Sequence, residues 1–209
     1  SNETFHTEEN GTLLLKNNEL VLVAPAYRFE RNTLTTNATS IASGAFAGST
    51  LIFNINAPQV TTVGSYAFAD CTNLQTVNMP KAETIGDYAF YNCIELDTVT
   101  MENLVKIGDF AFSECTKLES VYIGKGVNTI GEYAFFDCTS LTSIDIPDSV
   151  LEIASYAFYD CTNLESVIFP ESLQIIETEA FVNCYKISSV YIPKNVTTLG
   201  DDNNKNVFL

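Results

Sequence analysis

The feature that most constrains this chain is the dipeptide Ala-Phe, which returns at a nearly fixed interval. Subtracting the positions of successive Phe residues gives steps of 22, 22, 22, 23, 23 and 23 residues. A period in the twenties is the signature of stacked supersecondary units, each touching only its neighbours. The sequence therefore predicts one repeat array over residues 41–199, rather than the one or two ordinary domains that 209 residues would suggest. The seven copies are Ala45-Phe46, Ala67-Phe68, Ala89-Phe90, Ala111-Phe112, Ala134-Phe135, Ala157-Phe158 and Ala180-Phe181.

Each repeat begins with a predicted strand of the pattern Leu-x-x-Val-x-Met/Ile. In one copy these apolar positions are Leu74, Val77 and Met79, and the last two are spaced as in a strand with one buried face. Stacked copies would form a parallel sheet. A link then leads to the next apolar position, Ile85 in this copy, and the link alone accounts for the change from 22 to 23 residues. We expect that change to alter local curvature only.

The rest of each repeat is predicted to be a short helical turn. It runs from a glycine such as Gly86 through Ser, Asp or Thr to aromatic-Ala-Phe, and residues such as Asp87 are good helix N-caps. One or two turns are too short to be stable alone, so packing of Phe and Cys would have to hold them. The sequence thus predicts an α/β solenoid: a right-handed superhelix with a parallel β-sheet on the concave face and helical turns opposite.

Six cysteines each lie three residues after a repeat Phe and so form one column. Their side chains would point the same way from successive coils rather than at one another, and no histidine lies nearby to complete a zinc site. We therefore expect buried free thiols that act as small apolar side chains. The column is Cys71, Cys93, Cys115, Cys138, Cys161 and Cys184.

Both ends of the chain depart from the period. Residues 1–40 are predicted to form an N-terminal cap with a β-hairpin that turns at Asn17-Asn18, because asparagine tolerates the positive φ of a tight turn. Residues 200–209 are predicted to be a degenerate repeat or a tail. In that stretch Val207-Phe208 is either an eroded Ala-Phe or the point where the chain stops mid-repeat, and 201–205 is interpreted as a polar tail rather than a cation-binding loop.

The run from Ile130 to Pro147 resembles the BspA-like bacterial leucine-rich repeats, in the pattern Ile-Gly-x-x-Ala-Phe-x-x-Cys-x-x-Leu-x-x-Ile-x-Ile-Pro. The resemblance covers residues 41–199. It implies a curved solenoid, usually exported and displayed on the bacterial surface, that adheres to host or matrix proteins and has no catalytic residues. The proline column is broken at Glu102 and Gly124, which we interpret as structural departures. No signal peptide or anchor is recognised in the chain, so the extracellular or cell-surface location is an expectation from the resemblance alone.

Charge and motifs argue against several other functions. The net charge of −16 opposes binding to nucleic acid or anionic membranes, and no apolar run is long enough to span a bilayer. His6 is the only histidine, which makes a catalytic triad improbable, and no phosphate-binding loop or metal motif is present. We predict neither enzymatic activity nor a cofactor or metal.

What remains is a binding surface on the concave sheet. Exposed aromatic and aliphatic side chains ringed by charge are typical anchors for a protein partner. The main hypothesis is a non-catalytic module that binds a host or matrix protein; the alternatives are a glycan-binding module, which the absence of Trp disfavours, and a spacer without a ligand. A second surface, the column Tyr66, Tyr88, Phe110, Tyr133 and Tyr156, is either packing between coils or a binding stripe. The predicted partner-binding residues are Asp97, Glu119, Tyr122, Asp145, Glu165, Ile168 and Tyr191.

Overall fold

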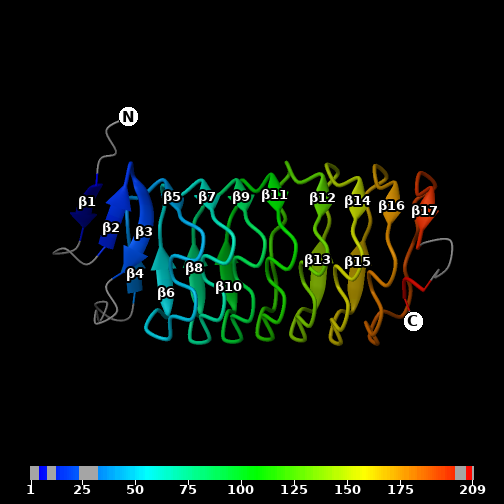
Figure 1. Cartoon of the computed structure of the whole chain (residues 1–209). Helices are drawn as coiled ribbons and strands as arrows, with labels where there is room; N and C mark the ends of the chain where they lie inside the picture. The colour runs from blue at the N-terminus through cyan, green and yellow to red at the C-terminus, as the bar shows by residue number, and fades with distance from the viewer. Residues whose placement is uncertain (1–4, 9–12, 24–32, 201–205, 209) are drawn as a thin grey trace.

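The chain forms a solenoid of stacked coils that runs from the N-terminal strands to β17, as Figure 1 shows. The structure is a computed structural model that describes residues 5–8, 13–23, 33–200 and 206–208. Every coil contributes short strands that pair with the equivalent strands of adjacent coils, so the architecture is set by parallel ladders that run along the solenoid.

The longest ladder, sheet 1, contains eleven strands in the order β1-β2-β3-β5-β7-β9-β11-β12-β14-β16-β17. From β3 onward all its pairings are parallel and in register from coil to coil, as in Val63 opposite Ile85. Within each repeat, the strand of this sheet lies at the end of the predicted link, as β9 does at Ile85. The strands are β1 (Phe5–Glu8), β2 (Leu13–Lys16), β3 (Glu19–Val23), β5 (Ser40–Ile41), β7 (Thr62–Val63), β9 (Thr84–Ile85), β11 (Lys106–Ile107), β12 (Thr129–Ile130), β14 (Glu152–Ile153), β16 (Ile175–Ile176) and β17 (Thr198–Leu199).

The predicted Leu-x-x-Val strands are confirmed in all but two of the coils, and they form two separate ladders. Sheet 2 has the order β10-β8-β6-β4, and sheet 3 is the pair β13-β15, all parallel. The intervening coil forms no strand over residues 119–124, and neither do residues 187–192 of a later coil. The strands are β4 (Thr33–Thr35), β6 (Asn54–Asn56), β8 (Thr76–Asn78), β10 (Thr98–Thr100), β13 (Ser143–Asp145) and β15 (Ser166–Ile168).

The predicted helical turns are wrong: the described residues contain no helix. A helix needs successive N–H groups to bond four residues back. Here the N–H of Ala69 bonds the carbonyl of Tyr66 three residues back, whereas the N–H of Phe68 bonds Ala89 in the next coil. Two residues per turn also have φ between 53° and 63°, as at Tyr66 and Asp70, which ends any helical run. The side of each coil opposite the Leu-x-x-Val strands is therefore a series of β-turns tied to its neighbour.

The predicted helix caps act between coils instead. The carboxylate Oδ1 of Asp87 accepts a hydrogen bond from the N–H of Asp109 at 3.2 Å, and Oδ1 of Asp109 accepts one from Glu132 at 2.9 Å. Each donor lies one coil further along the chain. Sequence reasoning chose the correct residue types for capping N–H groups but assigned them to a helix that does not exist.

The core is a column of stacked phenylalanines with the cysteines beside it. Phe90 and Phe112 have ring centroids 5.2 Å apart, and Phe112 and Phe135 are 5.5 Å apart. The cysteines are confirmed as buried free thiols. Each donates to a phenylalanine carbonyl in the preceding coil, as Cys115 Sγ does to Phe90 at 3.2 Å. Burial raises the pKa of Cys71 to about 12, which keeps this thiol protonated at neutral pH.

The two ends of the array are covered by different means. The hairpin β2–β3 is confirmed, with Asn17 and Asn18 at φ of 49° and 68°, and β3 then pairs with the first repeat strand, β5. At the other end Phe208 stacks on Phe181 with centroids 5.4 Å apart, and the N–H of Phe181 bonds the carbonyl of Val207. Val207-Phe208 thus occupies the place of an Ala-Phe pair. The polar tail predicted at 201–205 lies outside the described residues.

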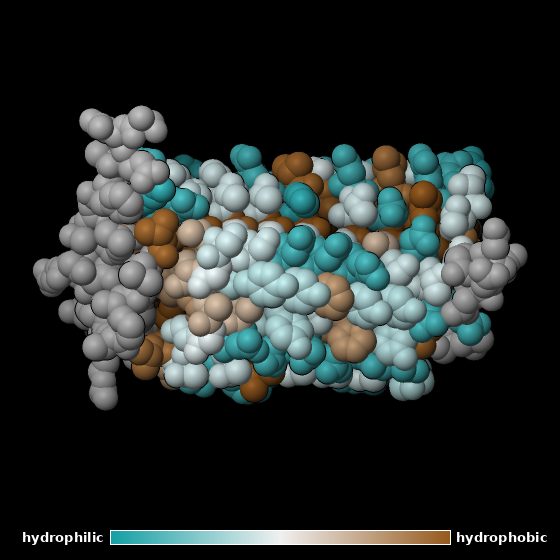
Figure 2. Space-filling view, in the orientation of Figure 1, coloured by the Kyte–Doolittle hydropathy of each residue, from teal (hydrophilic) through white to brown (hydrophobic). Residues whose placement is uncertain are grey.

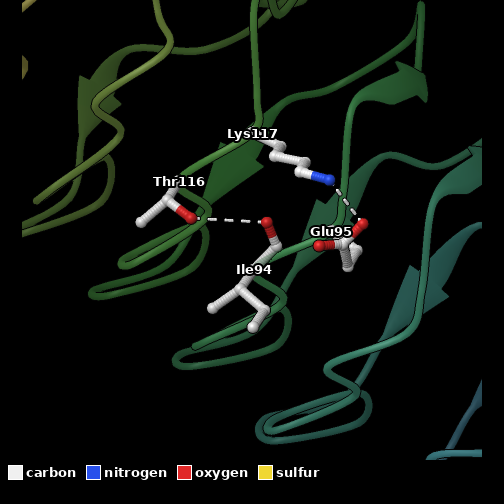
Figure 3. Close-up of polar contacts among 4 residues, drawn as sticks. All are labelled: Ile94, Glu95, Thr116 and Lys117. Atoms are coloured by element: carbon white, nitrogen blue, oxygen red, sulfur yellow. Dashed lines mark hydrogen bonds and ion pairs between the residues drawn. The ribbon is translucent and has the colours of Figure 1, made fainter.

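Polar side chains join adjacent coils at the turns. Figure 3 shows Thr116 Oγ1 donating to the carbonyl of Ile94 at 3.3 Å, and Lys117 Nζ paired with Glu95 Oε2 at 2.6 Å. Each contact links residues 22 positions apart, which is one coil. Because such exposed pairs contribute little individually, they adjust the stacking rather than drive it.

Candidate functional site

All seven predicted binding residues lie exposed on one face of the solenoid. We define the binding face as the outward side chains of sheets 2 and 3 and of the equivalent non-strand segments 120–122 and 189–191, together with the exposed residue that directly precedes each of these segments. The surface seen in Figure 2 is mainly hydrophilic along the array, with separate brown patches among polar side chains. On the binding face, for example, the exposed Ile168 lies directly opposite Asp145.

Four of the seven residues occupy equivalent positions in successive coils. Asp145 lies directly opposite Ile168 in the ladder of β13 and β15. Tyr122 and Tyr191 occupy the same position in the coils on either side, as the repeat alignment requires. This file of Tyr122, Asp145, Ile168 and Tyr191 is the centre of the predicted site.

The other three residues, Asp97, Glu119 and Glu165, each lie one residue before the outward segment of their coil. The backbone aligns this second file: the N–H of Thr142 bonds the carbonyl of Glu119, and the N–H of Glu165 bonds that of Thr142. Glu165 also forms an ion pair with Lys186 at 3.4 Å, and both side chains are at least half exposed. An exposed ion pair of this kind is weak, so the Glu165 carboxylate can readily exchange Lys186 for a cation of a partner.

The apolar exposure of the binding face is confined to its C-terminal half. Tyr122 is 46% exposed, Ile168 70% and Tyr191 67%. The equivalent residues in the N-terminal half are Asn56, Asn78 and Thr100.

Side chains in the N-terminal half bond to one another instead. Thr76 Oγ1 donates to Asn54 Oδ1 at 2.7 Å, and Asn78 Nδ2 donates to Asn56 Oδ1 at 2.9 Å. Amide and hydroxyl ladders of this kind satisfy polar groups within the protein. The large side chains of the predicted site thus begin where the ladder of hydrogen-bonded Asn and Thr side chains ends.

The structure adds a cavity that sequence reasoning missed. This junction cavity, of about 690 Å³, opens between the coil of β10 and the coil of Tyr122, where sheet 2 ends. Its size lies within the range of ligand pockets. The signal was present in the sequence: the proline column breaks at Glu102 and Gly124, and the first 23-residue coil follows. The lining includes Val99, Met101, Glu102, Asn103, Tyr122 and Lys125.

Two coils approach each other closely beside the cavity, as they do at the other repeat glycines. A Cβ atom on Gly124 would collide with the carbonyl oxygen of Leu104 and lie 2.5 Å from its amide nitrogen. Residues 119–124 then pair with neither flanking strand, so no ladder holds β10 and Tyr122 at strand spacing. The first 23-residue coil begins beside this junction, and the expectation that the added residue alters local curvature only stays a prediction.

The sequence profile that matches this chain is that of the BspA type leucine-rich repeat region, in six copies over residues 26–106 and 83–208. These matches cover most of the chain, including every coil of the binding face from β4 onward. The chain is a BspA-type leucine-rich repeat protein.

Solved structures agree on the fold of this BspA-type array. A leucine-rich repeat protein from Treponema pallidum is 23% identical with a TM-score of 0.73, over 93% of this chain and 96% of that one. A leucine-rich cell surface protein from Faecalibacterium prausnitzii is 20% identical with a TM-score of 0.70, over 98% and 74%. A leucine-rich repeat protein from Bacteroides ovatus is 23% identical with a TM-score of 0.64, and the match covers 96% of this chain but only 60% of that one. Comparison with curated proteins found no match.

The aromatic column of this BspA-type array is a packed stack. Tyr88 and Phe110 have centroids 4.4 Å apart, and the neighbouring pairs are 4.5 to 4.7 Å apart. Burial and then nearby charges, including Tyr156 and Glu132, raise the pKa of Tyr133. Because the rings stack face to face, the column offers ring edges rather than faces to a ligand, and it is a weaker candidate site than the binding face.

The described residues provide little for other chemistry. Within them, no group of three or more His, Cys, Asp or Glu side chains is arranged to hold a metal ion. The same residues contain no helix suited to crossing a membrane. The binding face offers exposed apolar side chains, carboxylates and a cavity, which are features suited to recognition.

Proposed function

We propose that this BspA-type array is a non-catalytic, cell-surface module that binds a protein partner through the binding face, with adhesion to a host or matrix protein as its role. The observation that carries the proposal is the file of exposed large side chains, Tyr122, Ile168 and Tyr191, among carboxylates. Bulky anchors of this kind supply most of the affinity at protein interfaces. The name of the F. prausnitzii relative, a cell surface protein, supports the location.

Charge favours a basic partner. Asp97, Glu119 and Asp145 lie on the same face as the anchors, in a chain of net charge −16. Complementary charge raises the association rate and rejects acidic surfaces more than it adds affinity. Binding should therefore weaken as salt rises, because ions screen exposed charges beyond about 10 Å at 0.1 M.

The test removes two anchors while leaving the fold intact. We expect Ile168→Ser combined with Tyr191→Ser to weaken binding at least tenfold, measured by surface plasmon resonance against purified secreted and matrix proteins of graded isoelectric point. The control combines Val105→Ser with Leu151→Ser, two residues that are 53% and 41% exposed beside sheet 1. Equal binding by both variants would remove the binding face from consideration.

Two alternatives give different results in the same assay. A glycan-binding module would bind oligosaccharides on an array and would lose little when Ile168 is replaced, because sugars stack on aromatic rings rather than aliphatic side chains. A spacer would bind none of the proteins in the panel. Neither alternative explains why the large exposed residues are confined to one half of the face.

A further inference from the structure

The junction cavity shares a wall with a second hollow. A cavity of about 350 Å³ lies on the other side of Tyr122 and Lys125, and its lining also includes Asp145, Pro147 and Asp148. Tyr122 and Lys125 thus form a ridge between the two hollows. A ligand that crosses this ridge would meet two different chemical surfaces.

The larger hollow has an apolar floor. Val99 is half-buried, whereas its equivalents Val77, Ile144 and Val167 are each at most 8% exposed. The junction therefore opens one core position toward solvent, next to the buried Met101. An apolar side chain placed there would remove Val99 from water, which favours its binding.

The smaller hollow is acidic. Asp145 and Asp148 are both exposed and face one cation, Lys125. No described residue forms an ion pair with Lys125, and Asp145 forms no side-chain hydrogen bond with a described residue. A guanidinium or ammonium group would meet two carboxylates here, and guanidinium matches carboxylates in two-bond geometry.

We propose that the two hollows receive one extended basic segment of a protein partner. A large apolar or aromatic side chain enters the junction cavity, and a Lys or Arg two or three residues away enters the acidic hollow. Adjacent coils are roughly 5 Å apart, and two or three residues of extended peptide span about 7–10 Å, which matches hollows one to two coils apart. This inference rests on the proposed function, since it specifies how a partner contacts the same face.

The test uses a capped eight-residue peptide with one phenylalanine and one arginine separated by a single residue. Titrated into the full chain labelled with nitrogen-15, it should shift the amide signals of residues 99–103, 122–126 and 145–149 in a saturable way. Replacing its phenylalanine with alanine, or its arginine with glutamate, should weaken binding at least tenfold. A peptide with no saturable effect on these signals would overturn the proposal.

Two threonines on β10 provide a matched pair of variants. Thr100 lines the junction cavity and Thr98 does not, although both point outward from the same strand. Thr100→Trp should fill the cavity mouth and weaken peptide binding at least tenfold, whereas Thr98→Trp should leave it unchanged. Circular dichroism of both variants controls for folding. Equal peptide affinity in the two folded variants would contradict the proposal.

Charge dependence has its own control in the next coil. Asp148→Asn should abolish the preference for arginine over glutamate, whereas Glu171→Gln, at the equivalent position one coil on and outside both hollows, should preserve it. If Thr100→Trp leaves partner binding intact while the Ile168 and Tyr191 variant loses it, the two-hollow site is wrong and the proposed function stands. If neither variant changes binding, both are wrong.

Discussion

The two halves of this solenoid have the same core and different faces. In the N-terminal half the coils have 22 residues, sheet 2 is continuous over four strands, and Asn and Thr side chains bond to one another along the binding face. In the C-terminal half the coils have 23 residues, sheet 3 has two strands, and Tyr122, Ile168 and Tyr191 are exposed. The phenylalanine stack crosses between the halves without a gap.

This difference shows that the repeat fixes the stacking of the coils and leaves the outward side chains unconstrained. Phe, Cys and the inward Val or Ile fix the stacking of every coil, so the outward positions are free to vary. One half uses that freedom to satisfy its own polar groups, and the other keeps large side chains available. The two regions meet at the junction, where the first added residue lies beside the cavity.

The largest effect is expected from closing the junction. Gly124→Ala would place a Cβ atom against the backbone of Leu104, and such overpacking costs about 1–3 kcal/mol. Urea denaturation measures the loss. The control Gly126→Ala should cost less, since its Cβ atom would lie 3.0 Å from the Val105 side chain and 3.3 Å from the carbonyl oxygen of Leu104, both longer than the contacts at Gly124. Equal losses would mean that the close approach of the two coils does not define the junction.

A smaller effect should distinguish the two faces directly. Asn78→Ala removes the 2.9 Å hydrogen bond to Asn56 and should cost about 0.5–1 kcal/mol. Asp145→Ala, at the equivalent position in the other half, removes no side-chain hydrogen bond to a described residue and should change stability by less than about 0.5 kcal/mol. Thermal unfolding of both variants checks this difference. A larger loss at Asp145 would reverse our view of which half stabilises itself.

The smallest effect concerns a column of acidic and amide side chains. Asn92 donates to Asp70, and Asn183 donates to Asp160, but Asp137 lies between Glu114 and Asp160. Burial first, and then these two carboxylates, raise the pKa of Asp137 above 3.8. Asp137→Asn should therefore stabilise the protein at pH 7 by about a few tenths of a kcal/mol, because water screens a partly exposed carboxylate.

The pH dependence of that gain follows from proton linkage. As pH falls through the folded-state pKa toward 3.8, the folded protein takes up a proton before the unfolded chain does, so the wild-type penalty disappears. The advantage of the Asn variant should shrink over the same window. Unfolding measured at pH 7 and at successively lower pH tests this. A gain that persists below pH 3.8 would show that its source is not the charge.

Periodicity was enough to predict the array, the strands and the thiol column. The Ala-Phe spacing fixes which residues align between coils, so the stacked Phe112 and the buried Cys115 follow directly. The helical turns could not be excluded in the same way. Capping residues such as Asp87 bond backbone N–H groups in either arrangement, and only the partner, one coil away, distinguishes them.

The exposure of the proposed binding residues could be predicted from the sequence, whereas the shape of the surface around them could not. Alternation within the strands identified the exposed file of Tyr122, Ile168 and Tyr191, because neighbouring positions in a strand face opposite sides. The junction cavity depends on how two coils of unequal length approach each other at Gly124, which no single repeat encodes. The broken proline column at Glu102 marked the place but was interpreted as structural only.

The ladder geometry also has a mechanical consequence. Among the described residues, the hydrogen bonds between coils, whether from the backbone or from a thiol such as Cys115, join a coil to its immediate neighbour. A pulling force on the two ends would therefore detach coils one after another instead of rupturing the whole molecule, and each release would lengthen the chain by roughly 75 Å. Such an array would extend in steps under load and so limit the peak force between its two ends.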